Sequence, residues 1–195
     1  EPKQIAFDVD SGGSFSPDGK QIVFHRHTIT PPKDEIFVIN ADGGQEKLIY
    51  SNTENQIHPQ FSPDGKVIVL SSFDKSKGQG EAAMRLGWIP SNGGNFTLIG
   101  NEHFLMLNDY RWLKDGSGLV VSGVLAKDTT NRLFTVSFPD GTVERLTKDA
   151  NDYYGNSITA DGKTIATIQA TTNSGIWEFD MSTKTTRQIS PTNEE

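Results

Sequence analysis

Five polar side chains are the strongest candidates for a ligand-binding site in this sequence: His58, Gln60, Asp109, Arg111 and Tyr153. The first four lie three or one residues before the leading residue of an internal repeat, on a segment expected to line a central channel. The equivalent positions of the other repeats hold Gly12, Ser14, Gly155 and Ser157. Convergent polar groups on an otherwise dry wall suit recognition of a ligand or partner at the channel mouth. The alternative is that an Asp109–Arg111 pair and a hydrogen-bonded His58 only stabilise neighbouring repeats.

Two other residue patterns could in principle carry chemistry. His25 and His27 are two apart beside an expected strand, so they could face one side and share a metal ion. Neither a cysteine nor a third nearby histidine supports a metal, so a solvated or loop histidine pair is the default. One aspartate recurs in every repeat: Asp18, Asp64, Asp115 and Asp161. A catalytic carboxylate would occur once, so these four are predicted to form turns.

The sequence lacks the common catalytic and phosphate-binding motifs. No Gly-x-Ser-x-Gly nucleophile elbow occurs. Gly78-Gln79-Gly80 lacks the rest of a phosphate-binding glycine pattern and the Lys-Ser/Thr that follows it. The sequence therefore predicts no catalytic residue, no cofactor and no metal ion.

Composition narrows the class of protein. The 195 residues include 11 Phe and 19 Gly, and only 34% are hydrophobic, as in many short strands joined by tight turns. The net charge of −7 disfavours binding to nucleic-acid phosphates. No apolar run reaches the roughly 18 residues of a membrane span, so no membrane insertion is expected. The absence of cysteine excludes disulfides and thiolate metal sites, and leaves the cellular compartment open.

The candidate residues must be positioned by a repeated hairpin. Phe15-Ser16-Pro17-Asp18-Gly19-Lys20 returns as Phe61-Ser62-Pro63-Asp64-Gly65-Lys66, and in weaker form from Trp112 and from Ile158. The leading residues 15, 61, 112 and 158 give a period of 46 to 51 residues, which is typical of stacked supersecondary units. Proline, aspartate and glycine in this order favour a tight turn between two strands.

Each repeat reads as four strands. In the first, a short segment leads into Phe15, and strands are expected at Gln21–His25, Glu35–Asn40 and Glu46–Ile49. Residues 27–34 carry Pro31-Pro32 and are expected to form a loop. Four-stranded units of this length predict an all-β fold, a β-propeller of antiparallel blades with four blades in this chain. A β-sandwich is possible, but it would not need the same turn at the same step four times.

The expected organisation is one propeller domain or segment over residues 1–195. The blades are expected at residues 10–50, 56–100, 107–148 and 153–190. Residues 3–8 resemble the outer strand of a preceding or closing blade, yet Arg187–Ile189 already supply such a strand at the other end. One explanation is a four-blade segment of a longer propeller. The other is a piece that pairs with its own copy, as a homodimer through open blade edges.

The hairpin residues resemble the TolB-like repeat, a bacterial relative of the WD repeat, over nearly the whole chain. The runs 108–112 and 146–162 are similar to propellers attached to bacterial serine/threonine kinases and membrane-linked transcriptional regulators. This resemblance implies a non-catalytic recognition module, sensory or envelope-associated, periplasmic or otherwise extracytoplasmic, that binds a protein partner or small ligand. The alternatives are a fragment of a propeller-containing enzyme, such as a lyase or the gating domain of a serine peptidase, and a self-associating scaffold.

Overall fold

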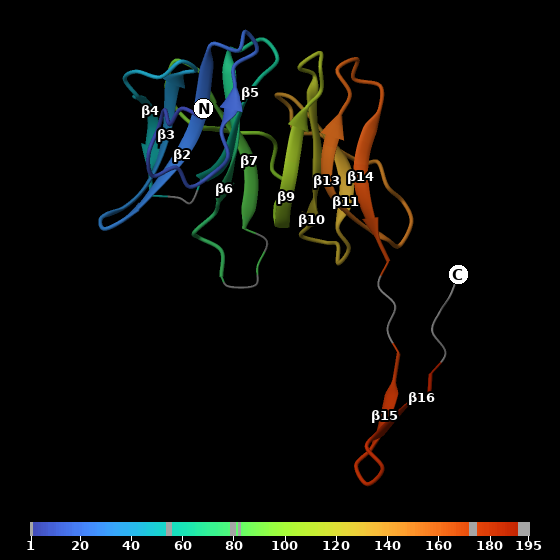
Figure 1. Cartoon of the computed structure of the whole chain (residues 1–195). Coiled ribbons are helices and arrows are strands. Elements are labelled where there is room, and N and C mark those ends of the chain that lie inside the picture. Colours follow the sequence, from blue (N-terminus) through green and yellow to red (C-terminus); the bar gives the residue numbers. More distant parts are fainter. Residues whose placement is uncertain (1, 54–55, 79–80, 82, 172–174, 191–195) are drawn as a thin grey trace.

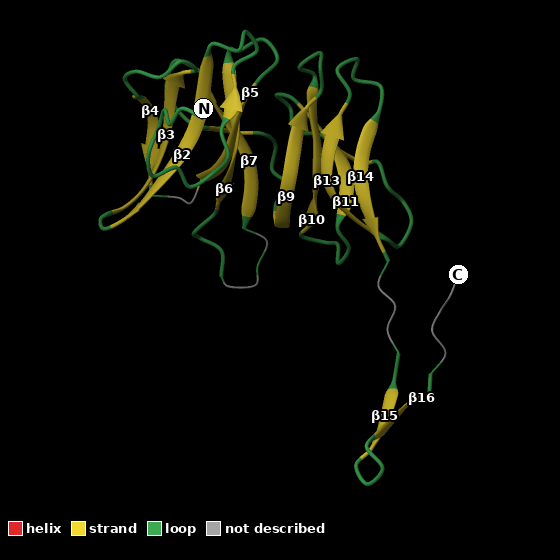
Figure 2. Ribbon diagram, viewed as in Figure 1, coloured by secondary structure: helices red, strands yellow, loops and turns green. Residues whose placement is uncertain are grey.

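The computed structural model describes residues 2–53, 56–78, 81, 83–171 and 175–190. Three four-stranded blades follow one another along the chain (Figures 1 and 2). Blade one contains β1 (Ser14–Phe15), β2 (Gln21–Ile29), β3 (Pro32–Asn40) and β4 (Lys47–Asn52). Blade two contains β5 (Gln56–Phe61), β6 (Val67–Phe73), β7 (Met84–Pro90) and β8 (Thr97–Leu98). Blade three contains β9 (Phe104–Trp112), β10 (Gly118–Leu125), β11 (Arg132–Ser137) and β12 (Val143–Arg145).

All strand pairs in these blades are antiparallel, and each blade keeps its strands in chain order. One bridge, between Met84 and Phe104, also joins blades two and three. No helix among the described residues is long and apolar enough to cross a bilayer. The expected all-β propeller fold is therefore confirmed, as a β-propeller segment.

The repeated turn is held by a ring of short-range hydrogen bonds. In blade two, Oδ1 of Asp64 accepts from the Ser62 hydroxyl at 2.7 Å and from the Lys66 amide at 3.0 Å. The Ser62 hydroxyl oxygen also accepts from the Val67 amide at 3.1 Å. Gly65 has φ +71°, a conformation that glycine adopts without a steric penalty. The turn therefore depends on residues within six positions, which explains why it recurs in the sequence.

The two weaker repeats keep this bonding with different residues. In the last repeat, Thr159 takes the serine position and its hydroxyl donates to Asp161 at 2.5 Å. In the third repeat, Leu113 takes the serine position, and its side chain has no hydrogen-bond donor. Ser117 instead donates to Asp115 through its backbone amide and its hydroxyl, at 3.0 and 2.7 Å. In the first repeat, Oδ1 of Asp18 accepts from the Ser16 hydroxyl at 2.7 Å and from the Lys20 amide at 3.1 Å. The prediction that the four aspartates form turns is therefore confirmed.

The hydrophobic core lies between blades rather than inside any one of them. Between blades one and two, Val23, Ile36 and Ile68 are fully buried in one cluster. Between blades two and three, a larger cluster includes Val69, Leu119 and Phe134. Each strand alternates its side chains between the two faces of its blade, so a blade buries both faces only when it has a neighbour on each side.

The fourth repeat does not form the expected four-stranded blade. Strands β13 (Asp152–Ile158) and β14 (Ile165–Ala170) form one hairpin, and β15 (Trp177–Asp180) and β16 (Thr185–Gln188) form another. The β13–β14 hairpin packs against blade three, whereas the β15–β16 hairpin stands clear of all other sheets (Figure 1). Among the described residues, β14 pairs only with β13, and Ile168 on β14 is 68% exposed.

Residues 3–8 also differ from expectation, since they form no strand in this structure. They lie against blade one, where the Lys3 ammonium donates to the carbonyl of Asp42 at 2.5 Å. The Arg26 guanidinium donates to the carbonyls of Phe7 and Asp8 at 2.6 and 3.2 Å. The segment is therefore held on blade one by side-chain to backbone hydrogen bonds.

The expected loop at residues 27–34 is wrong. Strand β2 continues to Ile29 and β3 begins at Pro32, with His27 paired to Asp34 and Ile29 to Pro32. Pro32 stands at the first position of its strand, where a missing amide hydrogen is tolerated. The two prolines therefore mark a tight hairpin turn rather than a long loop.

Candidate functional site

Four of the five predicted site residues come together in one pocket. His58 and Gln60 on β5 and Asp109 and Arg111 on β9 line a cavity of about 520 Å³. Blade one completes the wall with backbone-rich residues, and the remaining lining residues are Gly12, Gly13, Ser14, Pro59 and Asn108. The pocket thus spans the inner strands of three blades, as the repeat register predicted.

Tyr153 is not part of this pocket. Its hydroxyl donates to Oδ2 of Asp149 at 2.6 Å, and its carbonyl accepts from the Ser122 hydroxyl at 2.9 Å. The bond to Asp149 raises the pKa of the Tyr153 phenol. Tyr153 therefore ties β13 to blade three, and proximity in the sequence did not bring it to the site.

An irregularity in the inner strand sets the direction of the His58 side chain. The pairing of β5 with β6 shifts register between Ile57 and Gln60, and His58 within this bulge has φ +58°. The equivalent residue of the last repeat, Gly155, has φ +62°. A side chain in this left-handed region costs on the order of 1 kcal/mol, and such strained positions concentrate at functional sites. His58 pays this cost where the last repeat uses glycine.

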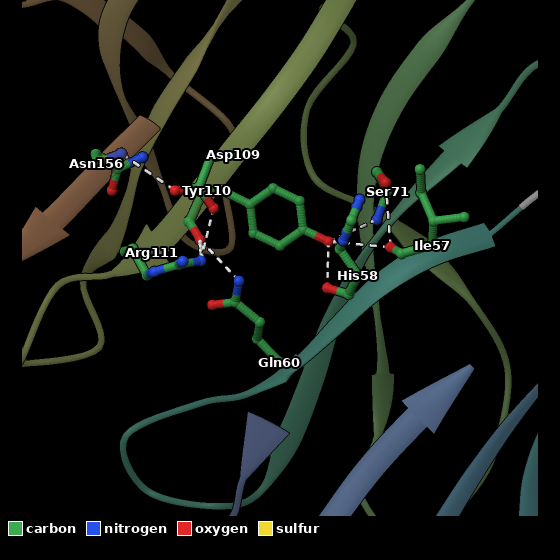
Figure 3. Close-up of polar contacts among 8 residues, drawn as sticks. All are labelled: Ile57, His58, Gln60, Ser71, Asp109, Tyr110, Arg111 and Asn156. Atoms are coloured by element: carbon green, nitrogen blue, oxygen red, sulfur yellow. Dashed lines mark hydrogen bonds and ion pairs between the residues drawn. The ribbon is translucent and has the colours of Figure 1, made fainter. Parts of the chain in front are cut away.

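A buried tyrosine holds the bulge in place. The side chain of Tyr110 runs from β9 toward β5 (Figure 3), and the residue is only 1% exposed. Its hydroxyl lies 2.5 Å from the carbonyl oxygen of His58 and 3.1 Å from that of Ile57, and accepts from the Ser71 amide at 3.0 Å. Burial raises the pKa of Tyr110, so its phenol stays protonated and donates. Tyr110 was missed in the sequence because it points away from the pocket.

The charged residues of the pocket bind one another and the neighbouring blades. Oδ1 of Asp109 accepts from the Arg111 guanidinium at 2.6 Å, and Oδ2 accepts from the backbone amide of Asn156 at 3.1 Å. The Tyr110 carbonyl accepts from Gln60 at 2.8 Å and from Arg111 at 2.9 Å (Figure 3). Asp109 and Gln60 are therefore committed to contacts between blades, while the Arg111 side chain keeps 46% of its surface exposed.

His58 is the pocket residue with the freest side chain. Among the described residues, no recorded hydrogen bond uses its imidazole, and the residue is exposed. Partial desolvation lowers the pKa of His58 below its usual 6.5, against the opposing effect of the Asp109 carboxylate. The imidazole is therefore neutral near pH 7 and can both donate and accept a hydrogen bond.

The two early histidines share a partner that the sequence did not reveal. His25 Nε2 and His27 Nδ1 lie 3.0 and 2.9 Å from the same oxygen, Oδ1 of Asp34. The β2–β3 pairing extends far enough to bring Asp34 opposite His27. The sequence did not predict this contact, because a loop was expected over these residues. Across the described ranges, no three His, Cys, Asp or Glu side chains are arranged to hold a metal ion.

Comparison with known proteins gives distant relatives. No protein-family model matches the chain. It is 23% identical over 155 residues to Dipeptidyl-peptidase 5 of Porphyromonas gingivalis, covering 76% of this chain and 22% of that protein. It is 28% identical over 100 residues to the Bone sialoprotein-binding protein of Staphylococcus aureus MRSA252, covering 51% of this chain and 9% of that protein. The chain thus spans less than a quarter of either relative.

Solved structures resemble the chain more completely. TolB from Acinetobacter baumannii matches with a TM-score of 0.66 and 21% identity, over 92% of this chain and 43% of that one. Puromycin hydrolase matches at 0.63 with 16% identity, over 95% and 29%. Oligogalacturonate lyase in complex with manganese matches at 0.61 with 16% identity, over 95% and 55%. These likenesses show a TolB-like β-propeller fold, and at these identities they extend to the fold alone.

Proposed function

We propose that this chain is a non-catalytic recognition segment of a larger propeller protein, and that it contacts a protein partner or small ligand through the channel pocket. The supporting observation is that some side chains of the pocket bind one another whereas others remain available to a ligand. Asp109 is held by Arg111 and by the Asn156 amide, while the His58 imidazole is free to bind. A carboxylate engaged on both oxygens is poorly placed as a general base.

The pocket favours a partner that offers both a negative and a hydrogen-bonding group. The half-exposed Arg111 guanidinium still has donors that can reach a carboxylate, and guanidinium–carboxylate contacts are strong and directional. His58 adds a neutral donor and acceptor beside it. We also propose a location outside the cytoplasm, on the resemblance of the repeat to periplasmic and envelope-associated propellers.

The experiment is a partner search directed at the pocket in the full-length parent protein. A photo-crosslinking amino acid replaces Gln60 in one sample and Lys33, at the far end of blade one, in a second. The partner captured only from position 60 is purified, and its affinity is measured by calorimetry. We expect Arg111→Gln and His58→Gly each to weaken binding about tenfold, and Lys33→Gln to leave it unchanged.

His58→Gly is the more decisive variant. It removes the imidazole and also relieves the left-handed backbone, so we expect the fold to be retained while binding is weakened. Unchanged affinity in both pocket variants, or equal capture from the two crosslinking positions, would show that this pocket is not the recognition site.

A second candidate is the propeller portion of a peptidase. The sequence match to Dipeptidyl-peptidase 5 over 76% of this chain is the observation that favours it. The test is hydrolysis of dipeptidyl p-nitroanilides by the purified parent protein. Activity that disappears on substitution of a serine outside this chain would favour the peptidase. An inactive parent that still binds its crosslinked partner would favour the recognition segment.

A further inference from the structure

A second cavity lies between blades two and three, apart from the channel pocket. Its volume is about 550 Å³, within the range of small-molecule sites. The walls come from the Asp-Gly turns of both blades and from the turn after β11. The lining includes Pro63, Asp64, Lys66, Trp88, Trp112, Lys114, Asp115 and Phe138. Both flanking blades are complete, so the open ends of the segment do not create this cavity.

Three aromatic rings form the floor of the cavity. Phe138 lies edge-on to Trp112, with ring centroids 5.1 Å apart, and edge-on to Trp88, at 5.9 Å. All three side chains rest on the core cluster between the blades and remain partly exposed. Mutual edge-to-face contacts hold the rings in fixed orientations, so the floor is rigid before any ligand arrives.

The aromatic floor is specific to this pair of blades. The register pairs Ile22 with Ile39 in blade one and Ile68 with Ile89 in blade two, so the residues just before Ile39 and Ile89 are equivalent. At the interface between blades one and two, the positions of Trp88, Trp112 and Phe138 hold Val38, Phe61 and Ser91. Packing of a blade therefore does not require this floor.

The rim of the cavity carries balanced charge. Asp64 and Lys66 form an ion pair at 3.2 Å, and Lys114 and Asp115 lie on the opposite turn. Oδ1 of Asp115 accepts from Ser117, while no bond to its Oδ2 is recorded among the described residues. The hydrogen bonds from Ser62 and the Lys66 amide, with the Lys66 charge, lower the pKa of Asp64 to about 2, so this carboxylate is ionised near neutral pH.

We propose that this cavity binds a neutral mono- or disaccharide. The C–H groups of a sugar ring can pack on the exposed parts of the three aromatic rings that line the cavity. Each sugar hydroxyl can donate to a carboxylate and accept from an ammonium group, so it satisfies both kinds of rim group. A cationic or anionic ligand would instead meet a like charge on one side of the rim, which reduces affinity.

Tryptophan emission tests the proposal directly. The chain has three tryptophans, and two of them, Trp88 and Trp112, line the cavity. In a Trp177→Phe background, all tryptophan emission therefore comes from the cavity. The labelled chain is first screened on an array of neutral, acidic and basic glycans. The neutral glycans that bind on the array, together with maltose, cellobiose and chitobiose, are then titrated against the chain by fluorescence and calorimetry. We expect a saturable change in emission and protection from acrylamide quenching.

Matched phenylalanine variants locate the site. Phe138→Leu keeps an apolar side chain and removes the ring, and we expect it to weaken saccharide binding about tenfold. Phe73→Leu, at a residue 39% exposed and outside the cavity, should leave binding unchanged. Equal affinity in the two variants would overturn the assignment. So would a failure of every neutral glycan to bind, or binding of N-acetyl-leucinamide and indole alone, which would indicate an apolar peptide site.

Discussion

Tyr110 links the channel pocket to the interior of the segment. Its ring is buried in the cluster between blades two and three, and its hydroxyl reaches the backbone on either side of the β5 bulge. The left-handed backbone of His58 is therefore held by a side chain from the neighbouring blade. A local strain at the surface is maintained by a tertiary contact, which is the usual way in which such strain persists.

Replacement of Tyr110 by phenylalanine measures this link. Tyr110→Phe keeps the ring and leaves the Ser71 amide and the His58 carbonyl without their partner, so we expect a loss of about 2 kcal/mol in unfolding free energy. Urea denaturation followed by circular dichroism provides the measurement. Tyr154→Phe, at a tyrosine 40% exposed, is the control and should change stability little. A loss no larger than the control's would mean that the hydroxyl does not support the bulge.

At the scale of the element, the Asp-Gly hairpin is the unit from which the segment is built. Its hydrogen bonds join residues at most five positions apart, and the bonding survives the replacement of Ser by Thr159. Local bonding of this kind is readable from sequence, which is why the positions of the inner hairpins were predicted. For the β2–β3 hairpin the sequence is misleading, because Pro31-Pro32 suggests a loop whereas β3 begins at Pro32, and a strand can begin at proline.

The Asp64 carboxylate of this hairpin makes the stability of the folded chain depend on pH. Hydrogen bonds from Ser62 and the Lys66 amide lower the pKa of Asp64 from 3.8 to about 2 in the folded chain. A depressed pKa means that the stabilisation is complete above about pH 4 and is lost as pH falls toward 2. We expect wild type to melt at a higher temperature than Asp64→Asn at pH 7, with the gap closing between pH 4 and 2. A gap that persists at pH 2 would show that ionisation is not the source.

At the scale of the whole molecule, the segment is complete in the middle and open at its ends. Blades two and three bury their shared face, whereas the last two hairpins separate and leave apolar side chains in water. On the outer hairpin, Trp177, Phe179 and Met181 are 61%, 52% and 81% exposed. Apolar surface of this kind is typical of an interface. A longer propeller and a pair of copies would both cover it, and the choice between them stays a prediction that a solution molecular mass can decide.

A matched pair of phenylalanines tests whether the outer hairpin stands apart in solution. Phe134→Ala, at a residue 1% exposed, should lower the unfolding free energy by about 3 to 5 kcal/mol. Phe179→Ala, at a residue 52% exposed, should cost less than about 0.5 kcal/mol. Urea denaturation of both variants gives the comparison. If Phe179→Ala costs nearly as much as Phe134→Ala, β15–β16 packs into a blade in solution.

The amino-acid sequence alone determined the blade repeat, the turn aspartates and the placement of four pocket residues, because each depends on a short-range bonding pattern that recurs every 46 to 51 residues. Only the tertiary structure decided that Tyr153 lies outside the pocket, that Tyr110 supports His58, and that Asp34 joins His25 to His27. It also separated β15–β16 from β14 and laid residues 3–8 on blade one. These outcomes depend on contacts between residues far apart in the sequence, and short-range sequence patterns do not predict such contacts.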